Sequence, residues 1–359
     1  MSRTEISCND MRSFMGYFNG NPERLAKYLE LLLMQDEASP VAYQSKSSFC
    51  RIHVILTTHC NLNCVWCHRR EEHLQDYLDR EIDYSKLVDL LPQLQGFEMI
   101  HWAGLGEPLL YRKIYEATQL ARKYIPNVMI TTNGTLLTPE VCDKLIQSGL
   151  TRIEVSIDGF DGKANERYRG SSVNKVIKYL EYISNNSSIS IQINSVLTNL
   201  NYEALFDAID HLKGIRNIDC IHTIPLFMTK YMIDNGIKVI TDDRHKELLK
   251  HWHNKIGEYG LNIKLRPDTT ETQVVDPIII MKRRHNICFS IYEDPIINID
   301  GYIVPCGRLQ HISLENVLEK GFDDAWNGPL CIKWREGQLK GIYDVLCERE
   351  CYMKNTVQK

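Results

Sequence analysis

The chain has 359 residues, of which 43% are hydrophobic and 25% are charged, a length that allows one large domain and a smaller one. Its 42 basic and 46 acidic residues leave a formal net charge of -4, which gives no overall attraction for nucleic acid. No apolar run approaches the roughly 18 uncharged residues of a membrane helix, and no signal segment follows Met1, so we expect a cytoplasmic protein without membrane or nucleic-acid partners.

Residues 1–50 are predicted to form a helical N-terminal extension, because apolar residues recur there at helical spacing. From Ile52 onward, short apolar strands alternate with amphipathic helical patterns. One helix carries signals at both ends, with Thr138 as its cap, Pro139 in its first turn and Gly149 as its stop. The expected strands are 52–57, 97–102, 128–132, 152–157, 189–197 and 218–224.

The alternation of strands and helices predicts an α/β fold in which parallel strands are joined by right-handed crossovers. The topology is either an open doubly wound sheet or a barrel. Both architectures place their ligands at the carboxyl ends of the strands, and each polar motif described below follows a strand. The sequence therefore predicts a single site at that edge of the sheet.

Three cysteines, Cys60, Cys64 and Cys67, follow the first expected strand with the spacing C-x3-C-x2-C. Three thiolates on one loop can hold three irons of a cubane cluster and leave the fourth iron open to a ligand. A zinc site that adds His59 or His68 would use the same residue types, but zinc sites usually pair two C-x2-C knuckles, and this segment has one. Twelve cysteines without a signal segment favour metal ligation over disulfides.

This cysteine motif resembles that of the radical S-adenosylmethionine (SAM) superfamily, and the resemblance extends over about residues 51–226. It implies a partial (β/α)6 TIM-like barrel. We assign residues 51–284 to this barrel and its C-terminal connecting segment. It also implies a [4Fe-4S] cluster whose open iron binds SAM and whose electron cleaves SAM to methionine and a 5'-deoxyadenosyl radical. A reductant protein such as flavodoxin or ferredoxin would supply that electron.

Further SAM contacts are implied by the same resemblance. The family's Gly-Gly-Glu-Pro motif is matched by Gly106, Glu107 and Pro108, while Leu105 replaces its first glycine. The Asn-Gly and Asp-Gly pairs at the next strand ends resemble contacts to the ribose and methionine groups, although such pairs are also common in ordinary turns. The remaining positions implied to bind SAM are Trp66, Asn133, Ser156, Asp158, Arg169 and Asn194.

A second group of cysteines lies within residues 285–359, which we expect to form a small C-terminal domain. An Asp300-Gly301 turn predicts a hairpin that separates the first two of these cysteines. Their order resembles the SPASM/twitch extensions of radical SAM enzymes and implies one auxiliary [4Fe-4S] cluster. The implied ligands are Cys288, Cys306, Cys347 and Cys351. Cys331 could replace one of the last pair, and a zinc ribbon is the alternative.

The function expected from the resemblance is removal of a hydrogen atom from a C-H bond of a substrate. We expect a small molecule, such as an aminosugar or cyclitol, that is dehydrogenated or epimerised. Epimerisation or crosslinking of a ribosomal peptide is one alternative, and a non-catalytic iron-sulfur or zinc protein is another. Cys220, on an expected barrel strand, could return a hydrogen atom to the substrate, or it could simply pack in the core.

Overall fold

The computed structural model describes residues 51–224, 228–240, 242–266 and 295–339, and the expected N-terminal extension lies outside these ranges. The described strands form one sheet in the order β7-β6-β5-β4-β3-β2-β1-β8-β9. Strands β1 to β7 run parallel, as the alternating pattern predicts. The strands are β1 (Ile52–Val54), β2 (Met99–Trp102), β3 (Asn127–Thr132), β4 (Arg152–Ser156), β5 (Ser190–Val196), β6 (Ile218–Ile224), β7 (Lys264–Arg266), β8 (Ile296–Ile297) and β9 (Ile303–Val304).

All six strands expected from the sequence are present, and their ends differ from the prediction by a few residues. The last strand matches the expected range 218–224, whereas β1 ends at Val54, before the predicted Thr57. Thr57 still makes an isolated bridge to Glu81, so the chain stays extended after the regular ladder stops. Strand β7 was not predicted, because only Leu265 among its three residues is buried.

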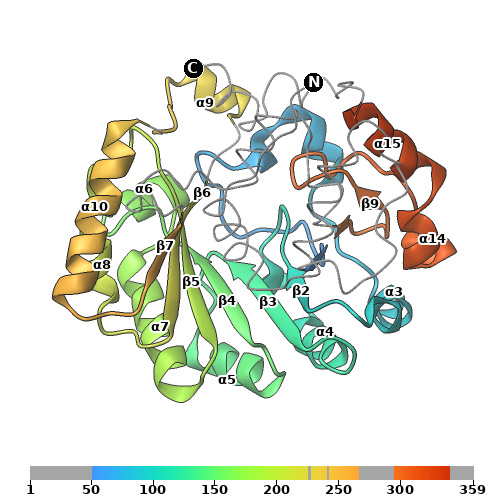
Figure 1. The fold of residues 1–359 in the computed structure, drawn as a ribbon, viewed down its shortest axis with the longest axis horizontal. Coiled ribbons are helices and arrows are strands. Elements are labelled where there is room, and N and C mark those ends of the chain that lie inside the picture. The colour runs from blue at the N-terminus through green and yellow to red at the C-terminus, as the bar shows by residue number, and fades with distance from the viewer. Residues whose placement is uncertain (1–50, 225–227, 241, 267–294, 340–359) are drawn as a thin grey trace, which may run out of the picture.

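Helices line the outer side of the curved sheet (Figure 1). Helix α5 begins with Pro139 after the Thr138 cap, whose hydroxyl accepts a hydrogen bond from the N-H of Val141, and Gly149 follows its end at a φ of +84°. The prediction for this helix is therefore confirmed. The helices between β1 and β8 are α3 (Tyr84–Leu90), α4 (Ile114–Ala121), α5 (Pro139–Gln147), α6 (Ala164–Arg169), α7 (Val173–Asn186), α8 (Ala208–Leu212), α9 (Lys230–Asp234) and α10 (Asp243–Glu258).

The two faces of the sheet differ in chemistry. On the outer face, side chains from the central strands are fully buried against the helices and belong to the main hydrophobic core; they include Ile100, Trp102, Ile130, Ile153, Val155, Ile193 and Ile221. The alternating side chains on the inner face are polar and include His101, Thr131, Glu154, Gln192, Asn194 and His222. Because a barrel wall with two apolar faces would enclose only packed side chains, the polar inner face marks the lumen as a place for ligands.

The C-terminal hairpin extends the barrel sheet. Strand β8 pairs in parallel with β1 and antiparallel with β9, and the Asp300-Gly301 pair lies in the connecting loop, where Gly301 has a φ of +87°. This confirms the predicted hairpin. The helices that follow it are α13 (Val317–Lys320), α14 (Phe322–Trp326) and α15 (Pro329–Leu339).

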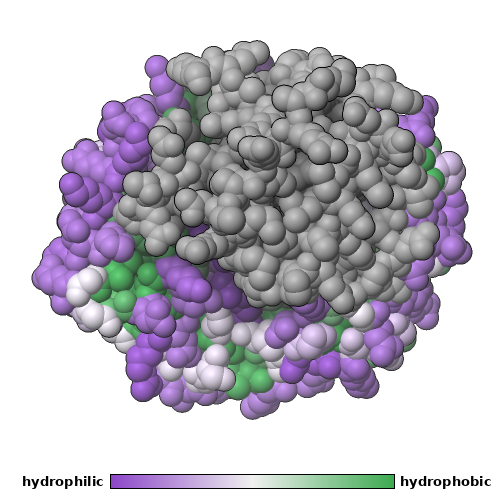
Figure 2. All heavy atoms as spheres, in the orientation of Figure 1, coloured by the Kyte–Doolittle hydropathy of each residue, from purple (hydrophilic) through white to green (hydrophobic). Residues whose placement is uncertain are grey.

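The surface seen in Figure 2 is mainly hydrophilic along its rim, and apolar side chains gather there in small areas only. This is expected for helices that turn one apolar stripe toward the sheet. In the part of the chain that the structure describes, we find no helix with the length and apolarity to cross a membrane.

Candidate active site

The cysteine loop follows the carboxyl end of β1. Within it, Cys64 is buried, whereas Cys60 and Cys67 are partly exposed. The backbone N-H of Cys67 donates to the carbonyl of Cys64 at 3.2 Å, and Cys67 begins the 3-10 helix η2 (His68–Arg70). The three thiols are therefore presented by one short, internally hydrogen-bonded loop at the edge of the sheet.

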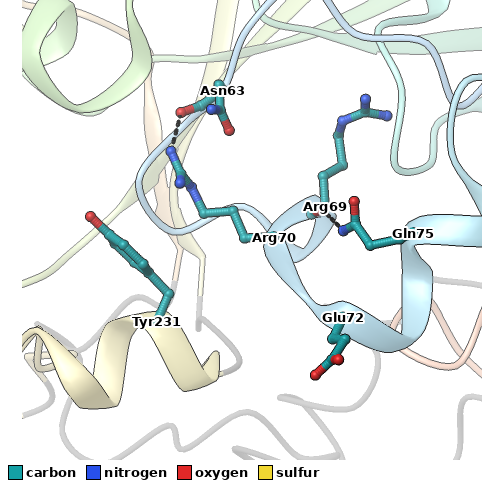
Figure 3. A pocket seen from close by; sticks show the side chains of 6 residues that line it. All are labelled: Asn63, Arg69, Arg70, Glu72, Gln75 and Tyr231. Carbon is teal, nitrogen blue, oxygen red and sulfur yellow. Dashed lines mark hydrogen bonds between the residues drawn. The ribbon is translucent and has the colours of Figure 1, made fainter.

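Two arginines brace this loop from its outer side. Arg70 donates from Nε to the carbonyl of Cys64 at 2.9 Å and from Nη2 to that of Asn63 at 2.8 Å. Arg69 donates to the carbonyl of Thr58 and forms an ion pair with Asp79. Figure 3 shows Arg70 turned back toward Asn63 beside a hollow of about 490 Å³. The loop conformation thus depends on charged donors that satisfy its carbonyl groups.

On its inner side the loop is held by a buried carboxylate. Asp158, which is fully buried after β4, accepts from the indole Nε1 of Trp66 at 3.1 Å and from Arg169 at 2.6 Å. Its second oxygen accepts from the backbone N-H of Val196 at 2.7 Å. Burial is the largest single effect on the pKa of Arg169 and lowers it, but the Asp158 carboxylate and the nearby thiols of Cys64 and Cys67 together raise that pKa above its ordinary value. Trp66 also packs at 5.4 Å from the ring of Tyr168 on α6.

Glu107, which follows β2, is a second buried carboxylate at this edge of the sheet. Its carboxylate is buried and accepts from the hydroxyl of Thr132 and the backbone N-H of Asn133, both at 2.7 Å, and from the N-H of Leu109 at 3.2 Å. Burial raises the pKa of Glu107, and these three donors oppose the shift. Pro108 is buried at the first position of the 3-10 helix η5 (Pro108–Leu110). Glu107 therefore fixes the ends of β2 and β3 to one another.

Gly106 brings the β2 loop against the cysteine loop. A Cβ atom at this position would lie 2.3 Å from the carbonyl oxygen of Thr57 and 2.7 Å from that of His59. The next residue, Glu107, donates its backbone N-H to the same His59 carbonyl at 2.7 Å. The glycine is thus required for backbone contact between the two loops, as the sequence suggested, but the contact observed is within the protein.

The remaining strand-end residues face the same region. Asn133 donates to the side chain of Asn61 in the cysteine loop at 2.9 Å and accepts from Thr135. Ser156 ends β4 and is paired in register with Asn194 on β5. Asn194 donates to the Glu154 carboxylate at 3.0 Å. The structure therefore gathers every described position of the expected SAM site around one edge of the sheet.

The donor set fits an iron-sulfur cluster. Burial raises the pKa of Cys64 to about 11, and Arg169 opposes this shift. Burial also raises the pKa of Cys60, while a hydrogen bond from the Leu62 N-H lowers it. Protonated thiols would lose their protons on binding metal, and N-H groups beside sulfur are common around such clusters. Across the described residues, no three side chains of His, Cys, Asp or Glu converge as for a single metal ion.

Sequence reasoning missed a network deeper in the barrel. Glu154 accepts from the hydroxyl of Thr131 at 2.9 Å, and that hydroxyl lies 2.7 Å from Nε2 of His101. Burial lowers the pKa of His222, on the neighbouring strand β6, to about 4. The available signal was the polar residue within each apolar strand: Glu154 lies between Ile153 and Val155.

The structure describes some, but not all, of the other cysteines to which the sequence analysis gave a role. Cys220 is buried on the inner face, in register with Gln192, and its role stays a prediction. Cys306 is partly exposed just after β9, and Cys331 is fully buried in α15. Burial raises the pKa of Cys331 to about 12, as for a core thiol. Three expected ligands lie outside the described residues: Cys288, Cys347 and Cys351.

Comparison with known proteins defines the class. The radical SAM superfamily pattern matches residues 54–214, and that of an iron-sulfur cluster-binding domain, SPASM, matches residues 288–352. The AdoMet-dependent heme synthase of Methanosarcina barkeri is 30% identical over 304 residues, which are 80% of this chain and 85% of the relative. The chain therefore belongs to the radical SAM superfamily. It is an enzyme that uses SAM and a [4Fe-4S] cluster, with an auxiliary iron-sulfur cluster in its SPASM domain.

One further protein and one solved structure are also similar to this chain. The mycofactocin maturase MftC of Mycolicibacterium smegmatis is 30% identical over 152 residues, or 42% of this chain and 38% of that protein. The crystal structure of Streptococcus suis SuiB bound to precursor peptide SuiA has a TM-score of 0.65 at 20% identity and covers 100% of this chain and 81% of SuiB. The predicted partial barrel is confirmed, and the non-catalytic interpretation is wrong.

The contact at Gly106 gives a testable prediction. Gly106→Ala places a methyl group against two carbonyl oxygens of the cysteine loop, so we expect loss of most of the iron bound by that loop and a lower melting temperature. Gly214→Ala, where an added Cβ meets nothing within 4 Å, is the matched control and should keep wild-type iron. Iron analysis and thermal melting after anaerobic reconstitution measure both effects. Wild-type iron in Gly106→Ala would contradict the close contact.

Proposed function

We propose that this enzyme reductively cleaves SAM to a 5'-deoxyadenosyl radical, which removes a hydrogen atom from a C-H bond of its substrate. In this proposal Cys60, Cys64 and Cys67 hold the cluster that supplies the electron. The observation that carries it is the single loop of three thiols, braced by Arg70 outside and by Asp158 through Trp66 inside. An electron donor such as flavodoxin or ferredoxin would reduce the cluster.

Within the proposed SAM site, the two buried carboxylates act mainly by positioning. Glu107 and Asp158 already have protein donors on both oxygens, so each holds its strand ends in place. Arg169 can still donate a hydrogen bond, because its buried Nε has no hydrogen-bond partner in the described part of the chain. A guanidinium with a free donor suits the carboxylate of SAM. Asn133 and Ser156 lie at the adjacent strand ends.

We propose a peptide as the substrate. The support is the similarity to SuiB, which was solved with precursor peptide SuiA, and to the maturase MftC. No relative described above supports the aminosugar or cyclitol that the sequence favoured. A second candidate is a tetrapyrrole, because the heme synthase matches 80% of the chain at 30% identity.

The cluster assignment is tested by replacing Cys60, Cys64 and Cys67 together with alanine. Wild-type protein should bind about eight irons after anaerobic reconstitution, and the variant about four, because the auxiliary cluster remains. The variant should form no 5'-deoxyadenosine from SAM and dithionite, since the thiolates that hold the reducing cluster are gone. Iron analysis and chromatography of the nucleoside measure the two effects.

The control for this experiment is Cys142→Ala, which removes a buried thiol on α5 and should keep both properties. Retained 5'-deoxyadenosine formation in the triple variant would contradict the assignment. A wild-type content of about twelve irons would instead indicate two auxiliary clusters, and about four irons would remove the auxiliary cluster.

The substrate proposal is tested by producing the enzyme together with short peptides encoded beside its gene. A peptide substrate should lose two hydrogens on crosslinking, or gain one deuterium in deuterated medium on epimerisation. Mass spectrometry detects both changes, and the triple cysteine variant should show neither. Modification of a tetrapyrrole, with every peptide unchanged, would favour the second candidate.

Cys220 is proposed as the hydrogen donor if the reaction is an epimerisation. Burial raises the pKa of its thiol to about 11, so the S-H bond is intact at neutral pH. Its hydrogen atom would pass to the substrate radical, and the thiyl radical left behind would take an electron and a proton, with the reductant protein as the electron source. Cys220→Ala should then abolish deuterium incorporation, while Cys142→Ala should not. Unchanged product stereochemistry in Cys220→Ala would leave this cysteine as core packing.

A further inference from the structure

Glu154 is the central acidic group on the inner face of the barrel. Its strand, β4, also carries Ser156 at the proposed SAM site, and Glu154 lies two residues earlier on the same face. At about 3.3 Å per residue, this places it about 7 Å deeper in the lumen. A group of the substrate that reached past the SAM site would meet this carboxylate.

Within the described ranges, hydrogen bonds reach one of the two Glu154 oxygens. Oε2 accepts from Thr131 at 2.9 Å and from Asn194 at 3.0 Å, and it lies 4.0 Å from Nε2 of His101. Oε1 has no hydrogen-bond partner among the described residues, although the side chain is 10% exposed. Oε1 does not belong to the fully buried side-chain atoms that lack a partner, so it faces accessible space in which a ligand can donate a charge-assisted hydrogen bond to it.

Among the described residues, no lysine or arginine forms an ion pair with the Glu154 carboxylate, and the titratable nitrogen that approaches it, Nε2 of His101, lies 4.0 Å away and also contacts the Thr131 hydroxyl. Arg152, one row below on β4, is engaged with Asp219 at 2.7 Å and with Gln192 at 2.8 Å. His222 is kept neutral by burial, which lowers its pKa to about 4. Arg266 lies on β7, three strands from β4, in register with His222 on β6. The missing element at Glu154 is therefore a positive donor.

We propose that Glu154 binds a cationic nitrogen of the substrate, either an ammonium or a guanidinium group, at the inner end of the active site. This inference rests on the proposed function, because it takes the lumen as the substrate site. For a peptide it specifies a basic side chain close to the residue that reacts. An anionic substrate group is disfavoured at the same position by charge repulsion.

The test uses small probes, so that it does not depend on turnover. N-acetyl-lysine methylamide and N-acetyl-arginine methylamide supply the cations, and N-acetyl-norleucine methylamide is a neutral analogue of the lysine probe. With the reconstituted, SAM-bound enzyme, we expect one of the cations to bind at least about tenfold more tightly than the neutral probe, the scale of one charge-assisted hydrogen bond. Saturation-transfer NMR titrations measure these affinities.

The key variant is Glu154→Gln. Its amide oxygen can still accept from Thr131 and Asn194, while its NH2 group replaces the unpartnered oxygen and removes the charge. We expect the preference for the cation to disappear. Thr131→Val removes one donor to Glu154 but keeps the charge, so it should retain the preference, as should Glu181→Gln on the exposed side of α7.

Three results would overturn the inference: no cation preference in the wild type, an undiminished preference in Glu154→Gln, or an equal loss in Thr131→Val. Iron content and melting temperature of each variant show whether it folds. The proposed function is judged separately by 5'-deoxyadenosine formation. A wild-type enzyme that cleaves SAM without preferring the cationic probes would therefore disprove this subsite alone.

Discussion

The cysteine loop depends on Asp158, a carboxylate that no solvent reaches. Burying a charge is unfavourable unless it is paired and fully hydrogen-bonded, and Asp158 meets this condition with donors from three parts of the chain. Trp66 comes from the cysteine loop, Arg169 from the end of α6, and Val196 from β5. Because none of these donors can leave without exposing a buried charge, the loop, the helix and the strand keep one arrangement.

Glu107 is a second buried carboxylate that must keep its hydrogen-bond donors, and it lies in the β2 loop that contacts the cysteine loop. Its donors come from the ends of β3 and of its own loop, and Gly106 beside it allows the backbone to touch the cysteine loop. The thiols are thus held between two buried carboxylates, each of which accepts three hydrogen bonds from the protein. A site fixed in this way needs little rearrangement when a cluster or SAM binds, because its loop is already ordered. Glu154 differs from both, since one of its oxygens lacks a partner in the described residues.

The sequence predicted the fold well where the hydrophobic pattern is strong. Strand β6 has its predicted limits, and α5 begins and ends at its predicted signals. Strand β7 was missed because a single buried leucine carries no periodicity. The motifs placed Asp158 and Glu107 just after strands, where the structure has them, but did not predict their contacts: Trp66 and Asp158 are 92 residues apart, and only folding brings them together. The polar residues of the inner network were visible as interruptions of apolar strands, but their contacts were not, since Thr131, Glu154 and Asn194 come from different strands.

The chain leaves β1 and β9 toward opposite ends of the sheet. The first group of cysteines follows the carboxyl end of β1, whereas β9 runs antiparallel to β8, which itself is parallel to β1. The chain therefore leaves β9 toward the amino end of β1, and Cys306 lies two residues after β9. The hairpin is nevertheless hydrogen-bonded to β1, through His53 to Pro295 and Ile55 to Ile297, both at 2.9 Å. The described hairpin of the SPASM region is thus tied by backbone hydrogen bonds to the strand from which the cysteine loop begins, so both regions are built on one sheet.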